Sequence, residues 1–295
     1  MMFIPPFDST TYSTYTQSPN PSWTYGQRVD TTPAGKDWVA GESAGWKIYN
    51  TAELDKVNMT KLLNSGIVPR PIAFVSTISE EGIENLAPYS WFNTVTTYPP
   101  IISFACNNNA LGGLKDTAVN VMNSQGFSVN IVSEPFIESA NATAIDSPPG
   151  FDEWSLSGLT KEKCVCVRLC DTIYALTTSV QVQIKASRVK ESAFSMECEL
   201  YKSIDITHPV TGEHTSTLIL AHVKYIHVRK DMLTQRGVID LTKFKPVARV
   251  GDISYARIGD AFRIASPTWA QDKAKIHEAL DDAKIGEAMA TLALL

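Results

Sequence analysis

The sequence predicts a mainly β protein built as a β-barrel with a few short helices. Short β-rich runs bounded by turn residues dominate the chain from residue 71 onward. Only two or three short helical patterns interrupt them. Strands and helices do not alternate in the βαβ rhythm of a doubly wound sheet. These three observations together favour the barrel.

The first half of the chain supplies three helices and four strands. A helix is predicted over 52–66, where apolar residues have near-helical spacing and Gly66 is a stop signal. A second helix is expected over 114–126, closed by Gly126, and a third over 135–144. Strands are predicted over 71–79, 83–91, 99–107 and 127–133. A hairpin turn at 80–82 joins the first two strands, and a proline pair, which cannot sit in the interior of a sheet, stands at the start of the third.

The second half is mostly strands, followed by one helix. Strands are predicted over 180–190 and 196–206, and residues 216–231 form either a strand pair or one bent strand. The last 30 residues predict an amphipathic helix, with Ser266 as cap and Pro267 in its first turn. Its apolar stripe is expected to dock on the body and comprises Ile276, Leu280, Ile285, Met289 and Leu292.

The composition divides the chain into three parts. Residues 1–45 are an extension rich in Ser, Thr, Pro, Gly and aromatic residues, 46–265 the folded domain, and 266–295 the terminal helix. Such a polar extension is disordered by default. Large aromatic residues in and directly after it offer the alternative that it packs across the body or a partner subunit; they are Trp23, Tyr25, Trp38 and, at the first residue of the folded domain, Trp46.

Charge and hydropathy exclude several classes of protein. The 295 residues include 26 basic and 31 acidic ones, a net charge of −5, and no long basic run that would favour nucleic-acid binding. No apolar run is long enough to span a membrane, and the first residues lack a secretory signal pattern. Five cysteines, an odd number, fit reduced thiols in a cytoplasmic protein.

The most informative stretch runs from residue 65 to 130. Small polar residues gather at its strand ends: Ser76, Thr77, Asn85, Ser90, Asn93 and Ser103. Lys115 and Thr117 then stand at the start of a helix, where unpaired N–H groups and the helix dipole favour a phosphate. The alternative is that Asp116 or Thr117 caps this helix and Lys115 is solvated.

The remaining groups of cysteine, glycine and acidic residues do not indicate a second functional site. Cys164, Cys166 and Cys170 form C-x-C-x₃-C, which lacks the paired spacing of a zinc site, so buried thiols and no metal are expected. Both common glycine-rich phosphate loops are absent. The acidic residues Asp146, Asp152 and Glu153 show no partner spacing and are interpreted as a solvated loop.

Several motifs occur together in one order. They are PRPIAFVST, NLAPYSWFN, KDTAVNVMNSQGFSVNIV and STLILAHVKYIHV. On these motifs, the segment from about Lys61 to Arg229 resembles the flavin reductase-like family of FMN-binding split barrels. The run over 248–267 is similar to the tail of the branch that carries PRPIA and NLAPYS.

The resemblance implies a six-stranded antiparallel Greek-key barrel, usually a homodimer, with FMN near the subunit interface. The residues that it would assign to FMN by side chain are Ser76 or Thr77, Asn85, Ser90, Lys115 and Thr117. The backbone of Ala87, Pro88 and Tyr89 would lie along the flavin ring, with Ser90 as the ring's hydroxyl partner. Arg70 would contact the phosphate or the pyrimidine side, unless it is an ordinary surface arginine.

The resemblance assigns no catalytic residue firmly. Reductases of the family carry Gly-Asp-His, whereas this chain has Gly212-Glu213-His214, two residues further from the last strand than usual. That departure puts direct handling of NADH or NADPH in doubt. His227 matches a histidine of this branch, with a hydrogen-bonded strand histidine as the alternative. Tyr255 would bond near the flavin, or else pack in the core.

The function implied is an FMN-dependent oxidoreductase. A flavin carries the redox chemistry itself, so the protein needs mainly to bind and orient it. One reaction is NAD(P)H-dependent reduction of flavin, bound or released to a partner oxygenase. The other is oxidation or oxygenation of a small organic substrate by bound FMN. A non-catalytic flavin- or ligand-binding protein, serving as store, sensor or interaction module, is the alternative of another class.

Overall fold

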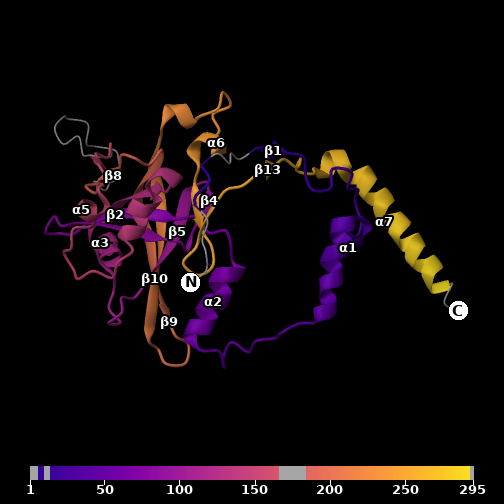
Figure 1. Ribbon diagram of the computed structural model, residues 1–295, viewed down its shortest axis with the longest axis horizontal. Helices are drawn as coiled ribbons and strands as arrows, with labels where there is room; N and C mark the ends of the chain where they lie inside the picture. The colour runs from indigo at the N-terminus through magenta and orange to yellow at the C-terminus, as the bar shows by residue number, and fades with distance from the viewer. Residues whose placement is uncertain (1–5, 10–13, 166–183, 293–295) are drawn as a thin grey trace, which may run out of the picture. The chain divides into compact units, whose positions relative to one another are not determined.

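The structure is a computed structural model that describes residues 6–9, 14–165 and 184–292 (Figure 1). The chain divides into two compact units. One comprises Val57–Ile258, and the other joins the residues before 57 to those from 259 onward. Among the described helices, none has both the length and the apolar character needed to cross a membrane.

The larger unit is built on one antiparallel sheet of seven described strands. Their order across the sheet is β3-β2-β6-β9-β10-β5-β4. The strands span Ala73–Ile78 (β2), Glu84–Tyr89 (β3), Phe92–Thr97 (β4), Pro100–Asn107 (β5), Gly126–Ile131 (β6), Phe194–Thr207 (β9) and His214–Val228 (β10). The predicted mainly β, antiparallel split barrel is confirmed.

The chain itself closes this sheet. β3 and β4 lie at opposite ends of the strand order, yet only Ser90 and Trp91 separate them in sequence. The Ala105 N–H donates to the Trp91 carbonyl at 3.1 Å, so this bend is attached to β5. β3 and β4 can therefore be counted as one bent segment, which reconciles seven strands with the six expected from the resemblance.

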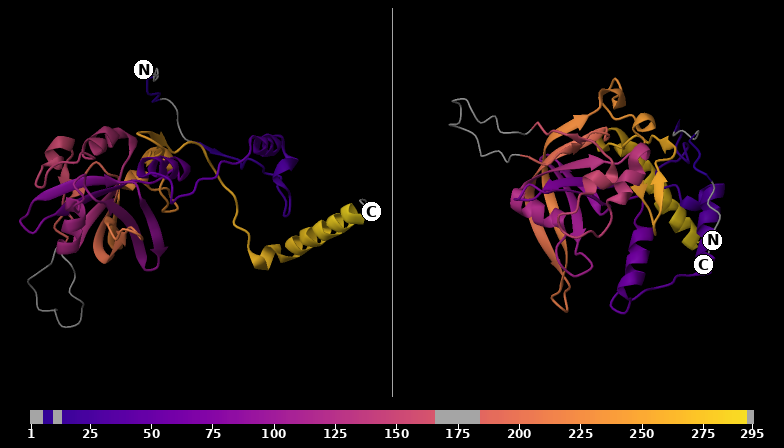
Figure 2. Two further views of the ribbon diagram at one scale, coloured as in Figure 1. Left: turned by 90° about the horizontal axis from the view of Figure 1, so that it is seen from below. Right: turned by 60° about the vertical axis from the view of Figure 1, so that its left-hand side comes forward.

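The last barrel strand is a single long strand. β10 runs without a break from His214 to Val228 and pairs with β9 along its length (Figure 2). Its register to β9 shifts at Leu220/Ala221 and at Val223/Tyr225. Such irregularities bend a strand, so one bent strand, and not a strand pair, occupies this segment.

Both faces of β2 are buried, which explains its continuous apolar sequence. Ala73 and Val75 face one core cluster with Phe104, whereas Ile72 and Phe74 face a second cluster. This alternation is the two-residue period of a strand. The second cluster lies between the sheet and the helical segments, and it includes Phe136, Trp154 and Val247.

Short helices accompany the barrel. They are α2 (Lys56–Gly66), α3 (Asp116–Ser124), η3 (Glu134–Phe136), α4 (Ile137–Ala142), α5 (Glu153–Ser157), η4 (Lys230–Met232) and α6 (Leu241–Phe244). The predicted end of α3 at Gly126 is wrong. Gln125 takes the left-handed conformation (φ 63°) and donates its N–H to the Val121 carbonyl, while Gly126 begins β6. A polar residue thus closes the helix, a role that usually falls to glycine.

Two small strand pairs complete the unit. β7 (Lys161–Glu162) pairs with β8 (Arg188–Val189), and β11 (Val247–Arg249) with β12 (Tyr255–Arg257). β8 is the only strand within the described part of the predicted strand at 180–190; residues 180–183 lie outside the described residues.

The terminal unit brings the two ends of the chain together. β1 (Tyr15–Thr16) pairs in parallel with β13 (Ala261–Phe262). The N–H and hydroxyl of Thr14 both donate to Asp260 Oδ1 at 2.8 Å. The unit also holds η1 (Val29–Thr31), α1 (Pro33–Ala40), η2 (Gly41–Ala44) and α7 (Trp269–Leu292).

α7 starts later than the sequence predicts. Ser266 and Pro267 precede it, and the Thr268 N–H donates to Asp272 Oδ2 at 2.8 Å. The predicted cap at Ser266 is therefore wrong, because Asp272 in the first turn holds the chain at Thr268. Of the predicted stripe, Ile276 is half-buried and Leu280 is 51% exposed. The side chains of its other three members lie outside the described residues.

Candidate functional site

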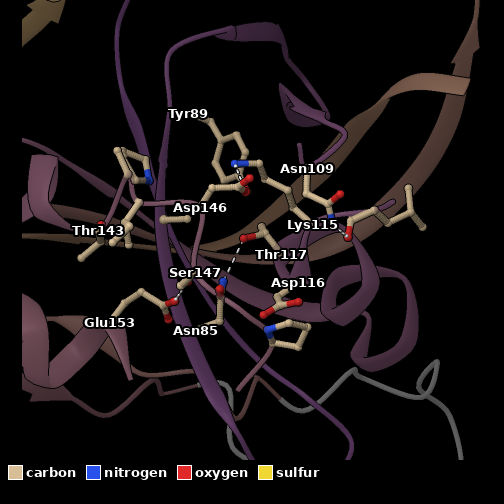
Figure 3. A pocket seen from close by; sticks show the side chains of 16 residues that line it. Asn85, Tyr89, Asn109, Lys115, Asp116, Thr117, Thr143, Asp146, Ser147 and Glu153 are labelled. Carbon is tan, nitrogen blue, oxygen red and sulfur yellow. Dashed lines mark hydrogen bonds and ion pairs between the residues drawn. The ribbon is translucent and has the colours of Figure 1, made fainter. Parts of the chain in front are cut away.

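A polar pocket opens where β3 ends and α3 begins (Figure 3). The loops that contain Asn109 and Asp146, together with Glu153 of α5, complete its lining. The structure brings six of the predicted cofactor residues together here: Asn85, Ala87, Pro88, Tyr89, Lys115 and Thr117. They come from two segments that are more than twenty residues apart in the sequence.

The start of α3 presents a cation and an uncapped helix N-terminus to this pocket. Lys115 occupies the N-cap position in an extended conformation, and no side chain caps the helix. The alternative in which Asp116 or Thr117 is the cap is therefore wrong, because these residues are the first two of the helix. The first N–H groups of a helix have no partner within it and carry partial positive charge. This end of the pocket is suited to an anion.

A buried hydrogen-bond network fixes the floor of the pocket. Asn85 Nδ2 donates to Thr117 Oγ1 at 2.8 Å and to Thr77 Oγ1 at 3.2 Å. Asn120 Nδ2 donates to the same Thr77 oxygen at 3.1 Å. All four side chains are less than 9% exposed, so the network locks β2, β3 and α3 together. Asn120 was missed by the sequence analysis, although its spacing of three places it on the helix face of Thr117.

Of the predicted pair Ser76 and Thr77, only Thr77 reaches this network. Ser76 is fully buried on the other face of β2, does not line the pocket, and its hydroxyl has no partner among the described residues. Successive side chains of a strand point to opposite faces, which is why one member of the pair is excluded.

Asp146 holds Lys115 from the opposite loop. Lys115 Nζ lies 3.6 Å from Asp146 Oδ1, and the Ala110 N–H donates to Asp146 Oδ2 at 3.1 Å. This carboxylate thus joins two loops that border the pocket. Figure 3 shows Asp146 turned toward Lys115. The lining also contains Asp116 and Glu153, so Lys115 faces an acidic surrounding.

Glu153 is 3% exposed, which makes the predicted solvated loop wrong at this residue. The preceding Asp152 caps α5 by accepting the Ser155 N–H, and this turns the Glu153 side chain inward. Ser147 Oγ donates to Glu153 Oε1 at 2.8 Å. Glu153 Oε2 has no hydrogen-bond partner among the described residues.

Tyr89 places a phenol at the inner wall of the pocket. Its ring packs against Phe104 with centroids 5.5 Å apart, and its hydroxyl makes no hydrogen bond among the described residues. Burial raises the pKa of Tyr89 well above its usual value, so the hydroxyl keeps its proton. The neighbouring Thr117 and Cys106 side chains also interact with this hydroxyl and modify its pKa.

Arg70 and Ser90 lie elsewhere, in a groove of about 470 Å³ beside α2 and β4. Arg70 is 7% exposed, so the alternative of an ordinary surface arginine is wrong. Its guanidinium donates to the carbonyls of Asn64, Ile67 and Val250. Arg70 therefore ties the end of α2 to a distant loop, and neither it nor Ser90 lines the pocket that contains Lys115.

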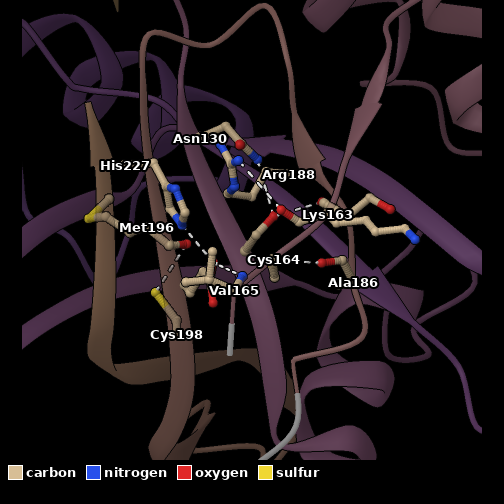
Figure 4. Close-up of polar contacts among 12 residues, drawn as sticks. Asn130, Lys163, Cys164, Val165, Ala186, Arg188, Met196, Cys198 and His227 are labelled. Carbon is tan, nitrogen blue, oxygen red and sulfur yellow. Dashed lines mark hydrogen bonds and ion pairs between the residues drawn. The ribbon is translucent and has the colours of Figure 1, made fainter. Parts of the chain in front are cut away.

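The three weak catalytic candidates also lie outside the pocket lining. His214 Nε2 is 3.2 Å from Thr217 Oγ1 and 3.5 Å from Asp205 Oδ1. His227 Nε2 lies 2.6 Å from Oε1 of the buried Glu197, which also accepts the Val165 N–H (Figure 4). The Tyr255 hydroxyl donates to Asn141 Oδ1 at 2.7 Å and thereby links β12 to α4.

Among the described residues, no group of three His, Cys, Asp or Glu side chains is placed to hold a metal ion. The Cys164 thiol is buried and donates to the Ala186 carbonyl. Cys166 and Cys170, the other members of the cysteine motif, lie outside the described residues.

Comparison with known proteins shows which protein family the sequence matches. Residues 65–246 match a family model described as the flavin reductase like domain. An uncharacterized protein of Aquifex aeolicus is 35% identical over 205 residues, which make up 70% of this chain and 92% of that protein. The matched segment includes every pocket residue that the sequence analysis predicted, whereas Tyr255 lies beyond it.

Solved structures share the fold. Nitrilotriacetate monooxygenase component B from Bacillus cereus has a TM-score of 0.64 at 31% identity, over 75% of this chain and 99% of that one. The 2-nitrobenzoate 2-nitroreductase of Pseudomonas fluorescens has a TM-score of 0.60 at 24% identity, over 76% and 98% of the two chains. At the latter identity the likeness concerns the fold alone.

Proposed function

Because this chain belongs to the flavin reductase-like domain family, we propose that it is an FMN-dependent oxidoreductase whose FMN phosphate lies at the start of α3. One observation carries the proposal. Lys115 and the first residues of α3, which no side chain caps, share a pocket with the Asn85–Thr117 network and with Ala87 and Pro88 of β3. An ammonium beside a helix N-terminus is a strong site for a phosphate.

The chemistry of the lining fits one end of a flavin nucleotide. The phosphate would face Lys115 and the α3 N–H groups, and Glu153 Oε2 offers an acceptor that lacks a partner among the described residues. The cavity measures about 100 Å³. Sites that bury a whole small ligand typically measure about 300–1,000 Å³. The pocket would thus hold the phosphate and the chain, while the ring extends outside it.

That shortage of volume supports a homodimer. A flavin ring is a large apolar surface, and an exposed ring would gain by being covered. A second copy of the chain can supply that cover, with FMN near the interface. The exposed apolar side chains beside the bend after β3 suit such a contact and include Leu63, Ile67 and Trp91.

The reaction that we propose is reduction of FMN by NADH or NADPH, followed by delivery of reduced flavin to an oxygenase partner. The 31% identity to a structure named as component B of a monooxygenase supports this choice. When bound between Lys115 and the β3 segment, FMN would supply the two-electron redox chemistry that side chains cannot provide. The chain needs to bind and orient the flavin, and no described side chain is assigned a proton-transfer role.

The β3 segment would then act through its backbone and one phenol. Pro88 has no N–H and a fixed φ, so it stiffens the wall of the pocket beside Tyr89. The Tyr89 hydroxyl is held as a donor because its pKa is raised by burial. Lys115 would hold the phosphate, which fixes the position of the flavin relative to both residues.

The first experiment is an absorption spectrum of freshly purified protein, before and after addition of FMN. Bound FMN should give the visible bands of oxidised flavin and quench its fluorescence. Anaerobic stopped-flow mixing with NADH, and separately with NADPH, should then bleach the bands. Absence of flavin binding at micromolar FMN would overturn the proposal.

The same measurements separate the competing functions. Bound flavin that neither nucleotide bleaches, but that turns over with an organic substrate and O₂, indicates the oxidase or oxygenase reaction. Bound flavin with no turnover under any condition indicates a store, sensor or interaction module.

A further inference from the structure

The pocket contains a buried carboxylate that the proposed phosphate contact does not use. Glu153 is the first residue of α5, is 3% exposed and lines the pocket together with Asn85 and Lys115. Its Oε1 accepts the Ser147 hydroxyl at 2.8 Å. Its Oε2 is buried and has no hydrogen-bond partner among the described residues.

The nearby cations are engaged elsewhere. Lys115 Nζ pairs with Asp146 at 3.6 Å, and Lys161 Nζ pairs with Glu84. Lys161 also lies over the ring of Trp154, the residue that follows Glu153. Glu153 is therefore an acceptor whose second oxygen no described protein group satisfies.

A buried acceptor of this kind requires a donor. A carboxylate accepts hydrogen bonds and donates none, and leaving it unsatisfied in a buried place is unfavourable. The donor must then come from what enters the pocket. Hydroxyl or N–H groups satisfy it, whereas a second phosphate or a carboxylate would be repelled.

The positions of Glu153 and Lys115 in the pocket indicate which part of a ligand would supply the donor. Figure 3 shows Glu153 on the side of Asn85 opposite to Lys115, with its carboxyl group turned toward Ser147 and Asn85. A ligand that places an anion at Lys115 meets Glu153 with the part next to the anion. In FMN that part is the ribityl chain, which carries three hydroxyl groups between phosphate and ring.

We propose that Glu153 recognises the hydroxylated chain of the flavin by accepting a hydrogen bond from it at Oε2. The inference rests on the proposed function, since it concerns the same pocket. It makes Glu153 a specificity residue: the pocket selects a phosphate at one end and neutral hydroxyl donors beside it. Ser147 is then a positioning residue, which orients the carboxylate through Oε1.

The test varies the ligand and the protein together. Binding of riboflavin and of a flavin with an unsubstituted pentyl chain at N10 is measured by fluorescence quenching, for the wild type and for Glu153→Gln. Riboflavin is the better probe than FMN, because removing a negative charge also relieves repulsion of the phosphate. The two ligands and two proteins form a double-mutant cycle that isolates the hydroxyl contact.

The wild type should bind riboflavin about tenfold more tightly than the pentyl flavin, the expected size of one hydrogen bond to a charged acceptor. Glu153→Gln should lose most of that preference while its affinity for the pentyl flavin stays within about twofold. Glu138→Gln is the matched control, since Glu138 is an exposed acid on the neighbouring α4 and should change neither affinity.

The outcomes are distinguishable. An unchanged riboflavin preference in a folded Glu153→Gln variant would overturn the inference while leaving the proposed function intact. A wild type that binds no flavin would overturn the proposed function itself. If Glu153→Gln does not fold, Glu153→Asp serves instead, because its shorter side chain moves the carboxylate away from the ligand and keeps the charge. This variant must likewise lose the preference for the hydroxylated chain.

Discussion

At the scale of single residues, the surroundings of Lys115 determine how strongly the pocket can hold an anion. The lysine is two-thirds buried beside a helix N-terminus, which favours a phosphate. Asp146 already neutralises it, and two further carboxylates line the pocket. A bound phosphate must therefore compete with the Asp146 carboxylate for the Lys115 ammonium group.

Lys115→Ala should weaken FMN about tenfold or more and leave riboflavin almost unchanged. A hydrogen bond to a charged group contributes about 1.5–3 kcal/mol, and about 1.4 kcal/mol corresponds to a factor of ten. The measurement is equilibrium binding of both flavins by fluorescence. Lys224→Ala is the control, because Lys224 pairs with Glu199 at 3.2 Å and does not line the pocket. Equal loss of both flavins would contradict the assignment.

Cys106 should resist alkylation in the native protein. Burial raises the pKa of its thiol from 9.0 to about 12, although Tyr89 and Lys115 partly offset this. The reactive thiolate is therefore scarce at pH 8. Peptide mass spectrometry after iodoacetamide treatment should find Cys106 labelled in guanidinium chloride and unlabelled without it. Equal labelling in both states would show that the barrel interior is accessible.

The same shift predicts the direction of an alkaline effect on stability. Because the folded-state pKa is the higher one, the unfolded chain loses the Cys106 proton first as the pH rises. This contribution to stability is complete below about pH 9 and declines between about pH 9 and 12.

At the scale of elements, two loops border the pocket and Asp146 joins them. It accepts the Ala110 N–H of one loop from its place in the other, and it pairs with Lys115 at the start of α3. A substitution of Asp146 should therefore affect both loops and the start of α3. An asparagine at this position keeps an acceptor for Ala110 but removes the charge.

Asp146→Asn should accordingly tighten FMN about two- to fivefold at low salt and leave riboflavin unchanged. Partly exposed ion pairs contribute about 0–1 kcal/mol, and their screening by salt should reduce the gain. Titration of FMN at two ionic strengths measures both effects. Asp231→Asn, which removes the exposed pair with Arg229, is the control and should do nothing. Weaker FMN binding in Asp146→Asn would mean that this carboxylate supports the site.

At the scale of the whole molecule, the hydrophobic clusters belong to the larger unit. The two extensive clusters of buried residues in the described chain lie between Ile72 and Val247. The terminal unit instead relies on the β1–β13 pair and on hydrogen bonds such as that between Thr14 and Asp260. Burial of apolar surface is the main source of folding free energy.

A chain of residues 57–258 should therefore fold without the terminal unit. Its melting temperature should lie within about 2–4 °C of the full chain, the shift that about 1 kcal/mol produces in a domain of this size. Thermal unfolding followed by circular dichroism measures this. A fragment without a cooperative transition would show that the ends of the chain are needed for the barrel.

Light scattering at micromolar concentration should report twice the mass of one chain. The groove between α2 and the start of β4 exposes Ile67 (62%), Leu63 (49%) and Trp91 (43%), a grouping typical of an interface. Ile67→Asp should shift the protein toward monomer, whereas Val210→Asp, 87% exposed in the β9–β10 connection, should not. A monomeric wild type with FMN bound would contradict the proposed dimer.

Local patterns predicted a mainly β barrel and the positions of most helices and strands, because the period of apolar residues distinguishes strand from helix. The principal members of the candidate pocket came from the resemblance to the flavin reductase-like family. The order of motifs likewise predicted that Asn85, Lys115 and Thr117 serve one site, and the structure places them in one pocket. Their binding roles stay predictions.

Which polar groups are available to a ligand became clear from the three-dimensional arrangement of the side chains. The sequence indicated no hydrogen-bond partner for Arg70, yet its guanidinium donates to the Val250 carbonyl, 180 residues away. Glu153 looked solvated, yet it is buried with one oxygen unsatisfied among the described residues. Ser90 follows Tyr89 directly but lines a different cavity. The physical reason is common to all three: burial and hydrogen bonding depend on atoms brought close by folding, whereas sequence patterns report neighbours along the chain.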